Sequence, residues 1–320
     1  MKIPQYDLDG LGGEFLITQD LEKLISEFFG VKHCVMVTSG TAAIFLALRA
    51  CGSKKVAVPD LTMIATATAS ELANCDIVLT HNNEIPSGVD TYIHVSLNGR
   101  DNDIEKVIKS NPGVIIIEDA CQSFGSKFNN KYIGTFGKVG CFSFSPHKIL
   151  SAGNGGCIIT NDDEIAKNVK RLKNFGRESG GADQHDFIGY NFKFTDIQAK
   201  FVIEQFPELN SKLRRKIDIY KKYYDRLSKI MLPHAGVPWF VDIYVDDRDS
   251  LHSYLASKDV GTRKMYPLIS SQPPFLSHKT FGDSRSDLDR SKRGLWLPSS
   301  GKLSDDEIDH VIELILDWLK

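Results

Sequence analysis

Strand and helix signals alternate along the chain from about residue 31 to residue 205, and this alternation constrains the fold more than any other feature. The segment VKHCVMVTSG predicts a strand that ends in a turn, and the following TAAIFLALRACG predicts a helix closed by Gly52. Further short apolar runs and amphipathic segments succeed each other in the same way. The pattern favours a mostly parallel sheet covered by helices on both faces, so we expect an α/β fold.

The pattern changes in the last third of the chain. A long helical stretch begins at FTDIQAKF, and Pro207 within it predicts a bend or break. A strand-like FVDIYV and a terminal helix follow, and Ser304 with Glu307 predicts a capping box at the start of that helix. We therefore expect a large domain over residues 1–205 and a smaller C-terminal α/β domain over residues 206–320.

Composition argues against several classes of protein. The 320 residues are 42% hydrophobic and 25% charged with a formal net charge of −2, which gives no electrostatic reason to expect nucleic acid or an anionic membrane as partner. No apolar run is long enough to span a membrane, and the start MKIPQYDLDG lacks a signal-peptide core, so we expect a cytoplasmic protein. The six scattered cysteines form no CxxC pair, and we expect free thiols rather than a metal site.

Two candidate reactive side chains follow neighbouring strand signals. The apolar run 114–117 leads into Asp119 and predicts a buried strand with a carboxylate at its carboxyl end. A second apolar run, 140–144, is followed by Lys148 just past its tip. Because ligands bind at the carboxyl ends of strands in open α/β sheets, we expect Asp119 and Lys148 to face one another across one pocket.

A lysine and an acid in this relation are what pyridoxal phosphate (PLP) chemistry requires. The lysine forms a Schiff base with the cofactor, and the carboxylate keeps the pyridine nitrogen protonated so that the ring accepts electrons. The plainer alternatives are a surface lysine after a strand and a helix N-cap at Asp119. The aromatic run before Lys148 and the glycine-rich hairpin 153–156 after it favour the catalytic interpretation.

A candidate phosphate site lies earlier in the chain, in TSGTAA at residues 38–43, where a strand turns into a helix. Backbone N–H groups at a helix N-terminus bind phosphate when the surrounding side chains are small. A plain Ser/Thr N-cap is the alternative. Ser143, just upstream of Lys148, offers a hydroxyl to the same cofactor and favours the phosphate interpretation. The sequence has no GxxxxGK[ST] and no GxGxxG after its first strand, which disfavours nucleotide-binding folds of those types.

These blocks together resemble the sugar aminotransferase family called DegT/DnrJ/EryC1/StrS, which has the fold-type-I aminotransferase architecture. The resemblance runs through nearly the whole chain, and its order and spacing make it specific. It includes TSGTAA, HVSLNGR, IIIEDACQSFG, GTFGKVGCFSFSPHKILSAGNGG, IGYNFKFTDIQAKF and LWLPSSGKLSDDEI.

The resemblance implies a role for each candidate site residue. Lys148 would carry the cofactor and move protons, and Asp119 would pair with the pyridine nitrogen. The other expected cofactor contacts are Gly40, Thr41 and Ser143 at the phosphate, Gln122 beside the ring hydroxyl, Met63 over the cofactor face, and Asn191 at the phosphate of the neighbouring subunit's cofactor. This last role implies a homodimer with shared active sites.

The chain departs from the family pattern in four ways. Met63 stands where the family usually has an aromatic ring, although a thioether can also pack on a π-face. Asn154 replaces a usual acid, and Lys193 replaces a frequent arginine. The chain is also shorter than typical members, before KKVAVP and in the C-terminal domain, so we expect different substrate-contacting loops.

The activity implied by the resemblance is transfer of an amino group from L-glutamate to a nucleotide-linked 4-keto-6-deoxy sugar, at C4. The main alternative is C3 amination of a nucleotide-linked 3-keto-6-deoxy sugar. A PLP-dependent sugar dehydratase is a second alternative, which Lys148 disfavours because that branch replaces the lysine with histidine. A non-catalytic nucleotide-sugar-binding or regulatory protein is a third. The nucleotide base and the product stereochemistry stay open.

Overall fold

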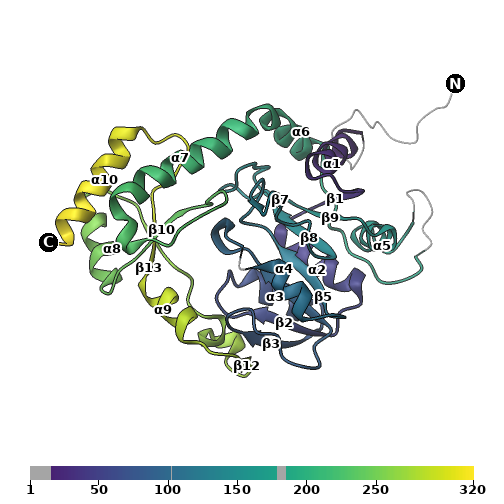
Figure 1. Cartoon of the computed structure of the whole chain (residues 1–320). Coiled ribbons are helices and arrows are strands. Elements are labelled where there is room, and N and C mark those ends of the chain that lie inside the picture. The colour runs from purple at the N-terminus through teal and green to yellow at the C-terminus, as the bar shows by residue number, and fades with distance from the viewer. Residues whose placement is uncertain (1–15, 102, 179–184) are drawn as a thin grey trace.

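The computed structural model describes residues 16–101, 103–178 and 185–320, and an eight-stranded sheet forms its centre (Figure 1). The strand order is β1-β9-β8-β5-β4-β2-β3-β12. Its members are β1 (His33–Val37), β2 (Lys55–Pro59), β3 (Asp76–Thr80), β4 (Thr91–Val95), β5 (Ile115–Asp119), β8 (Val139–Ser143), β9 (Gly156–Thr160) and β12 (Lys279–Phe281). Neighbours from β8 to β12 pair in parallel, whereas β9 is antiparallel to both β1 and β8. The mostly parallel sheet expected from the alternation is confirmed.

Helices cover both faces of this sheet. They are α1 (Leu16–Phe29), α2 (Gly40–Cys51), α3 (Ala65–Leu72), α4 (Ile104–Ser110), α5 (Asp163–Lys173) and α6 (Asp196–Gln205). The alternation of side chains along β1 separates two apolar clusters: Val35 and Val37 belong to the cluster that contains α2, and Met36 belongs to the one that contains α1. The helix α2 ends at Gly52 in the left-handed conformation (φ 69°), as its sequence predicted.

The C-terminal part has an apolar core and a three-stranded sheet of its own, in the order β10-β13-β11. Its elements are α7 (Leu209–Leu227), β10 (Val241–Tyr244), α8 (Arg248–Ala256), β11 (Arg263–Lys264), α9 (Arg285–Arg293), β13 (Gly294–Leu297) and α10 (Asp305–Trp318). A 3-10 turn, Phe206–Glu208, separates α6 from α7 at the expected proline. The expected capping box between Ser304 and Glu307 is present.

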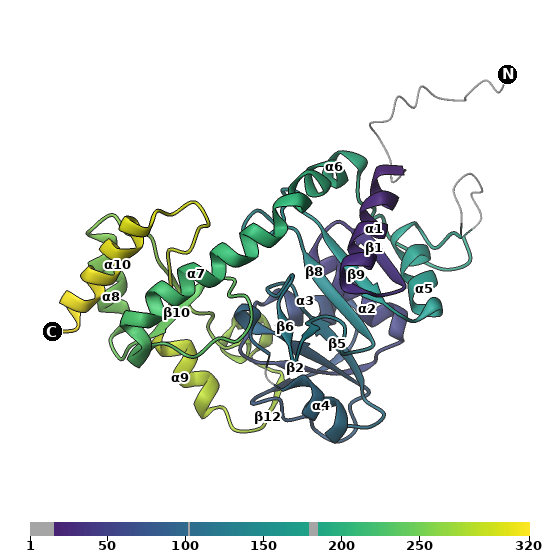
Figure 2. The ribbon, with the colours of Figure 1, turned by 45° about the horizontal axis from the view of Figure 1, so that its top comes forward.

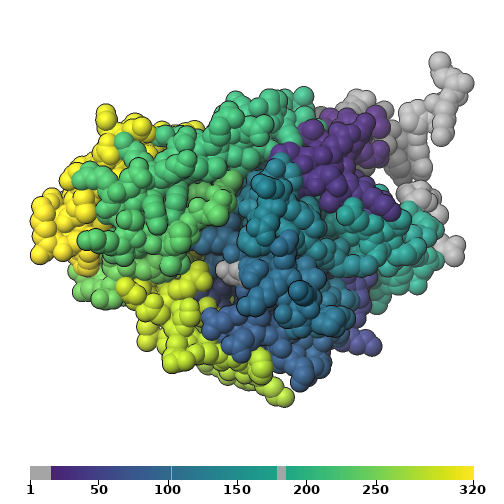
Figure 3. Space-filling model, viewed as in Figure 1, coloured from purple at the N-terminus to yellow at the C-terminus, as the bar shows by residue number. Residues whose placement is uncertain are grey.

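The two parts of the chain are in direct contact. Figure 2 shows α7 running from α6, beside the large sheet, to the C-terminal elements. Figure 3 shows that the surfaces of the two parts are in contact. In addition, β12 leaves the C-terminal part and adds a parallel edge strand to β3 of the large sheet. The expected domain boundary at residue 205 stays a prediction. The strand β12 lies after this boundary in the sequence but belongs to the sheet of the large domain.

Smaller elements complete the described chain. The strands β6 (Lys127–Phe128) and β7 (Lys131–Tyr132) form a short hairpin, and 3-10 turns occupy Leu97–Gly99, Ser228–Ile230, Ile269–Ser271 and Pro273–Phe275. Within the described ranges, no helix has both the length and the apolar character needed to cross a bilayer.

Candidate active site

Lys148 lies in the loop that follows β8, against an aromatic side chain from the C-terminal part. Its Nζ is 3.7 Å from the centroid of the Trp239 ring. Burial lowers the pKa of the Lys148 amine to about 8, although the Cys121 and Asp119 side chains act in the opposite direction. A lysine with this pKa is partly neutral near pH 8, and a neutral amine can act as a nucleophile or a base.

Asp119 ends β5, and both of its carboxylate oxygens are held. Thr66 donates its hydroxyl to Oδ2 at 2.7 Å, and the backbone N–H of Cys121 donates to Oδ1 at 3.2 Å. Residues 120–126 form turns and irregular backbone rather than a helix, so Asp119 is not a helix N-cap. Its charge raises the pKa of Lys148. Among the described residues no hydrogen bond or ion pair joins the two side chains, and their facing one another stays a prediction.

The neighbouring acid, Glu118, faces a different environment. Its carboxylate accepts the backbone N–H groups of Gly134, Phe136 and Gly137, each at 2.6 Å, and it is fully buried. Burial raises the pKa of Glu118, while these three donors favour the ionised form. Because successive side chains of a strand point to opposite faces, Glu118 holds the loop 134–137 and Asp119 faces the other side of the sheet.

The expected phosphate segment and Ser143 lie side by side. Ser39 caps α2 by accepting the Ala42 N–H at 3.0 Å. A Cβ atom at Gly40 would lie 2.9 Å from Ser143 Cβ and 2.8 Å from Cys121 Sγ, so only glycine lets the start of α2 approach this closely. The positive end of the α2 dipole and the Ser143 hydroxyl therefore occupy one region, which suits an anion.

The other expected cofactor contacts differ in how firmly they are held. Gln122 is buried, and its Oε1 accepts the backbone N–H of Asn98 at 2.6 Å. Met63 precedes α3 and is 43% exposed, so its thioether is accessible to a flat ligand. Thr41 is half-buried in the first turn of α2.

Asn191 lies in the segment that follows α5. Its backbone forms a bridge with Asn174 just after α5, and its side chain is exposed. In the described ranges, no hydrogen bond or ion pair joins Asn191 to Lys148 or Asp119. An exposed position suits a residue that reaches a second subunit, and that role stays a prediction.

The C-terminal part contributes residues to this site that the sequence did not identify. Besides Trp239, these include Tyr266 and Arg263, whose guanidinium carbon lies 5.5 Å from the centroid of the Tyr266 ring. Burial raises the pKa of Tyr266 to about 12, although its hydrogen bond with Gln122 acts in the opposite direction, so the hydroxyl stays protonated. An arginine close to aromatic residues in TRKMYPL was the available signal, but sequence alone does not show which segment folds over the strand ends.

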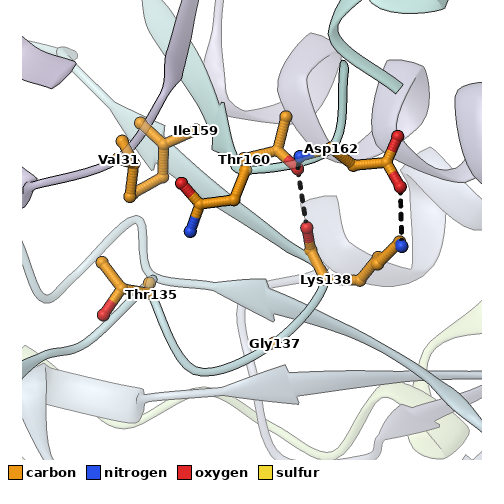
Figure 4. Close-up of a pocket in the computed structure, with 9 residues that line it drawn as sticks. Val31, Thr135, Gly137, Lys138, Ile159, Thr160 and Asp162 are labelled. Carbon is orange, nitrogen blue, oxygen red and sulfur yellow. Dashed lines mark hydrogen bonds and ion pairs between the residues drawn. The ribbon is translucent and has the colours of Figure 1, made fainter. Parts of the chain in front are cut away.

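A cavity of about 710 Å³ adjoins Lys148 on the side of the C-terminal part. Basic side chains predominate among its charged lining residues, which include Lys212, Arg215, Lys216 and Lys302. Its volume is within the range of small-molecule sites. The pocket in Figure 4 is smaller, about 220 Å³, and an ion pair of 2.6 Å between Lys138 and Asp162 lies in its wall. Its lining does not include Lys148, so the cavity beside Lys148 is the better candidate. Asp119 is not among the lining residues of either, and a pocket shared by Lys148 and Asp119 stays a prediction.

The mostly parallel central sheet with a smaller C-terminal part is the architecture of a fold-type-I aminotransferase. The chain belongs to the DegT/DnrJ/EryC1/StrS aminotransferase family, whose model matches residues 15–316. An aminotransferase of this family from Brucella abortus has a similar structure, with a TM-score of 0.87 and 26% identity, covering 97% of this chain and 91% of that one. The family and the enzyme class expected from the resemblance are confirmed.

Relatives with related names match the chain over most of its length. GDP-perosamine synthase of Escherichia coli O157:H7 is 30% identical, covering 94% of this chain and 89% of that protein. EpsN of Bacillus subtilis, named as a putative pyridoxal phosphate-dependent aminotransferase, is 29% identical over 94% and 87%. UDP-N-acetyl-3-dehydro-alpha-D-glucosamine 3-aminotransferase of Acidithiobacillus ferrooxidans is 29% identical over 92% and 86%. The cofactor expected from the sequence agrees with the name of EpsN.

Proposed function

We propose that the protein uses pyridoxal 5′-phosphate to transfer an amino group from L-glutamate to C4 of a nucleotide-linked 4-keto-6-deoxy sugar. The observation that supports the proposal is the Lys148 amine, which lies against the Trp239 ring with a pKa lowered by burial, in the loop after β8, the strand that pairs with the one ended by Asp119. A nucleotide sugar as acceptor is supported by the GDP- and UDP-linked names of relatives that span about nine tenths of the chain.

The described residues fit this cofactor. When bound, PLP supplies a conjugated ring that accepts electrons from the carbon that loses a proton. Lys148 would hold the cofactor covalently, and its amine would then carry the proton between the two reacting carbon atoms. The pKa of about 8 leaves the amine partly neutral under mildly basic conditions, as a base requires.

The remaining residues would orient and stabilise the cofactor. Asp119, with Thr66 and the Cys121 N–H fixing its oxygens, would hold a proton on the ring nitrogen. The start of α2 at Gly40 and the Ser143 hydroxyl would bind the phosphate. Trp239 and the C-terminal part would exclude water from the Lys148 amine, which strengthens electrostatic interactions within the site.

Amination at C3 is the second candidate, because the A. ferrooxidans relative is named as a 3-aminotransferase and is nearly as similar as the GDP-perosamine synthase. A panel of dTDP-, GDP- and UDP-linked 6-deoxy sugars that carry the ketone at C4 or at C3, each incubated with glutamate, tests both positions. We expect mass spectrometry and NMR to show an amino group at C4 of one of these sugars. Amination at C3 would favour the second candidate, and amination of free α-keto acids alone would contradict both.

We also propose a homodimer in which Asn191 of one subunit contacts the cofactor of the other. Its exposed side chain, outside the contacts around Lys148, supports this. Asn191→Ala is expected to weaken cofactor binding, and mixed with an inactive Lys148→Ala variant it should give hybrid dimers that regain activity at one of their two sites. A fully active monomer in analytical ultracentrifugation would contradict the proposal, as would mixing without any gain.

A further inference from the structure

Asn98 lies between the candidate active site and the C-terminal part. It is 1% exposed and belongs to the 3-10 turn Leu97–Gly99 that follows β4, with a left-handed backbone (φ 58°). Among residues other than glycine, asparagine and aspartate tolerate this conformation best. The backbone therefore accepts few residue types here, and only some of them carry a side chain that accepts a hydrogen bond.

Asn98 forms hydrogen bonds both to Gln122 of the large domain and to the C-terminal segment 234–240. Its backbone N–H donates to Gln122 Oε1 at 2.6 Å. On the other side, its Oδ1 accepts the backbone N–H of Phe240 at 2.6 Å, and its carbonyl oxygen accepts His234 Nε2 at 2.8 Å and the Trp239 N–H at 3.5 Å. One buried residue thus joins an expected cofactor contact to the segment 234–240 of the C-terminal part.

The bond from His234 persists over a wide pH range. A carbonyl oxygen only accepts, so Nε2 carries the proton, and Nδ1 accepts the Gly236 N–H at 3.1 Å. Burial, with a contribution from the nearby Arg100 charge, lowers the pKa of His234 to about 4. The imidazole is therefore neutral at physiological pH and keeps the tautomer that bonds Asn98.

Close packing holds the same segment beside the turn. Ser126 donates its hydroxyl to the Gly99 carbonyl at 3.1 Å and accepts the Val237 N–H at 2.9 Å. A Cβ atom at Gly99 would lie 2.1 Å from the Val237 carbonyl oxygen. The segment 234–240 therefore lies directly on the turn, with little space for it to shift.

This segment ends in the aromatic wall of the site. The Trp239 indole faces Lys148 Nζ at 3.7 Å and donates its Nε1–H to the His147 carbonyl at 2.8 Å. From α7, Lys216 donates to the Trp239 carbonyl at 2.8 Å. Trp239 is thus held by Lys216 of α7 and, on the side of the large sheet, by His147 at its indole and by Asn98 at its backbone.

We propose that Asn98 is a positioning residue, which locks the segment 234–240 to the large sheet and thereby holds the Trp239 indole against the Lys148 amine. The indole limits where the amine can move and excludes water from it, and its π-face stabilises the ammonium form. Through its N–H, Asn98 also fixes Gln122. The proposal concerns the geometry of this chain and does not depend on which sugar is the substrate.

The test follows Trp239 itself by ¹⁹F NMR of the full-length apoprotein labelled with 5-fluorotryptophan. The chain has three tryptophans, and the Trp239 resonance is the one lost in Trp239→Phe. Asn98→Gly keeps the left-handed backbone, the N–H and the carbonyl but removes Oδ1. We expect the Trp239 resonance to shift and broaden, while that of Trp318, at the end of α10, stays at its wild-type position.

Two further variants separate positioning from general loosening. Asn74→Gly makes the same substitution at an exposed asparagine that also has a left-handed backbone (φ 59°), and should leave all resonances unchanged. Asn98→Asp keeps an acceptor for the Phe240 N–H and should restore the Trp239 resonance toward its wild-type position.

A last variant removes the contact between Asn98 and the segment 234–240 by changing His234 instead of Asn98. It tests the proposal even if Asn98→Gly does not fold. His234→Phe removes the donor to the Asn98 carbonyl and should also displace the Trp239 resonance. A Trp239 resonance that stays at its wild-type position in Asn98→Gly and His234→Phe would overturn the proposal. An equal shift in Asn74→Gly would overturn it as well.

Discussion

Replacing Lys148 with alanine is expected to lower turnover by roughly 10²–10⁴-fold or more, because a positioned general base alone contributes about that much. The physical reason is the environment of the amine: burial lowers the pKa of Lys148 to about 8, so that a neutral amine is available. Turnover is measured with glutamate and the accepted nucleotide sugar, at saturating substrate, in wild type and variant.

Lys138→Ala is the matched control for this experiment. Lys138 precedes β8 at the end opposite Lys148, and its Nζ pairs with Asp162 at 2.6 Å on the surface. Turnover of this variant should remain close to wild type, since a surface ion pair contributes little to stability. If Lys148→Ala were as active as Lys138→Ala, Lys148 would not be the proton carrier.

Replacing Asp119 with asparagine is expected to cost about 10²-fold or more in turnover while the protein still binds its cofactor, by analogy with other lost electrostatic stabilisers. The amide has nearly the shape of the carboxylate and can still accept one of the bonds from Thr66 and the Cys121 N–H. It lacks the charge that keeps the ring nitrogen protonated. The variant should therefore fold and load the cofactor but transfer amino groups slowly, as followed by absorbance and by single-turnover kinetics.

The control for Asp119→Asn is Asp76→Asn, which changes an exposed acid at the first residue of β3. It removes the same charge from a strand that does not supply the site, and its turnover should match wild type. Near-normal turnover of Asp119→Asn would mean that the carboxylate only shapes the turn after β5.

The local order of the fold could be predicted because its signals are local. Apolar runs of four or five residues and a helix stop such as Gly52 depend on neighbouring residues, and the structure places α2 and β5 where these signals lie. The edge strand β12 could not be predicted in this way. Its three residues are exposed, and they are extended because they pair with β3, about two hundred positions earlier in the chain.

The residues of the candidate site also fall into those that local signals predict and those that only tertiary packing reveals. Asp119 and Lys148 follow strands of one sheet, so topology alone brings them together. Trp239 and Tyr266 reach the site only because the C-terminal part packs against the large sheet, which no periodicity encodes. Asn98 is a similar case: the sequence shows an asparagine in a turn, and only the structure shows the bonds to Gln122 and Phe240.

If Lys148 bears the cofactor, chemical reduction should attach the cofactor permanently to this residue. The protein loaded with pyridoxal 5′-phosphate is reduced with borohydride, which makes the lysine–cofactor bond permanent, and is then digested and mapped by mass spectrometry. We expect a pyridoxyl modification on the peptide that contains Lys148. A modification on any other lysine, or an unmodified Lys148 peptide from fully loaded protein, would contradict it.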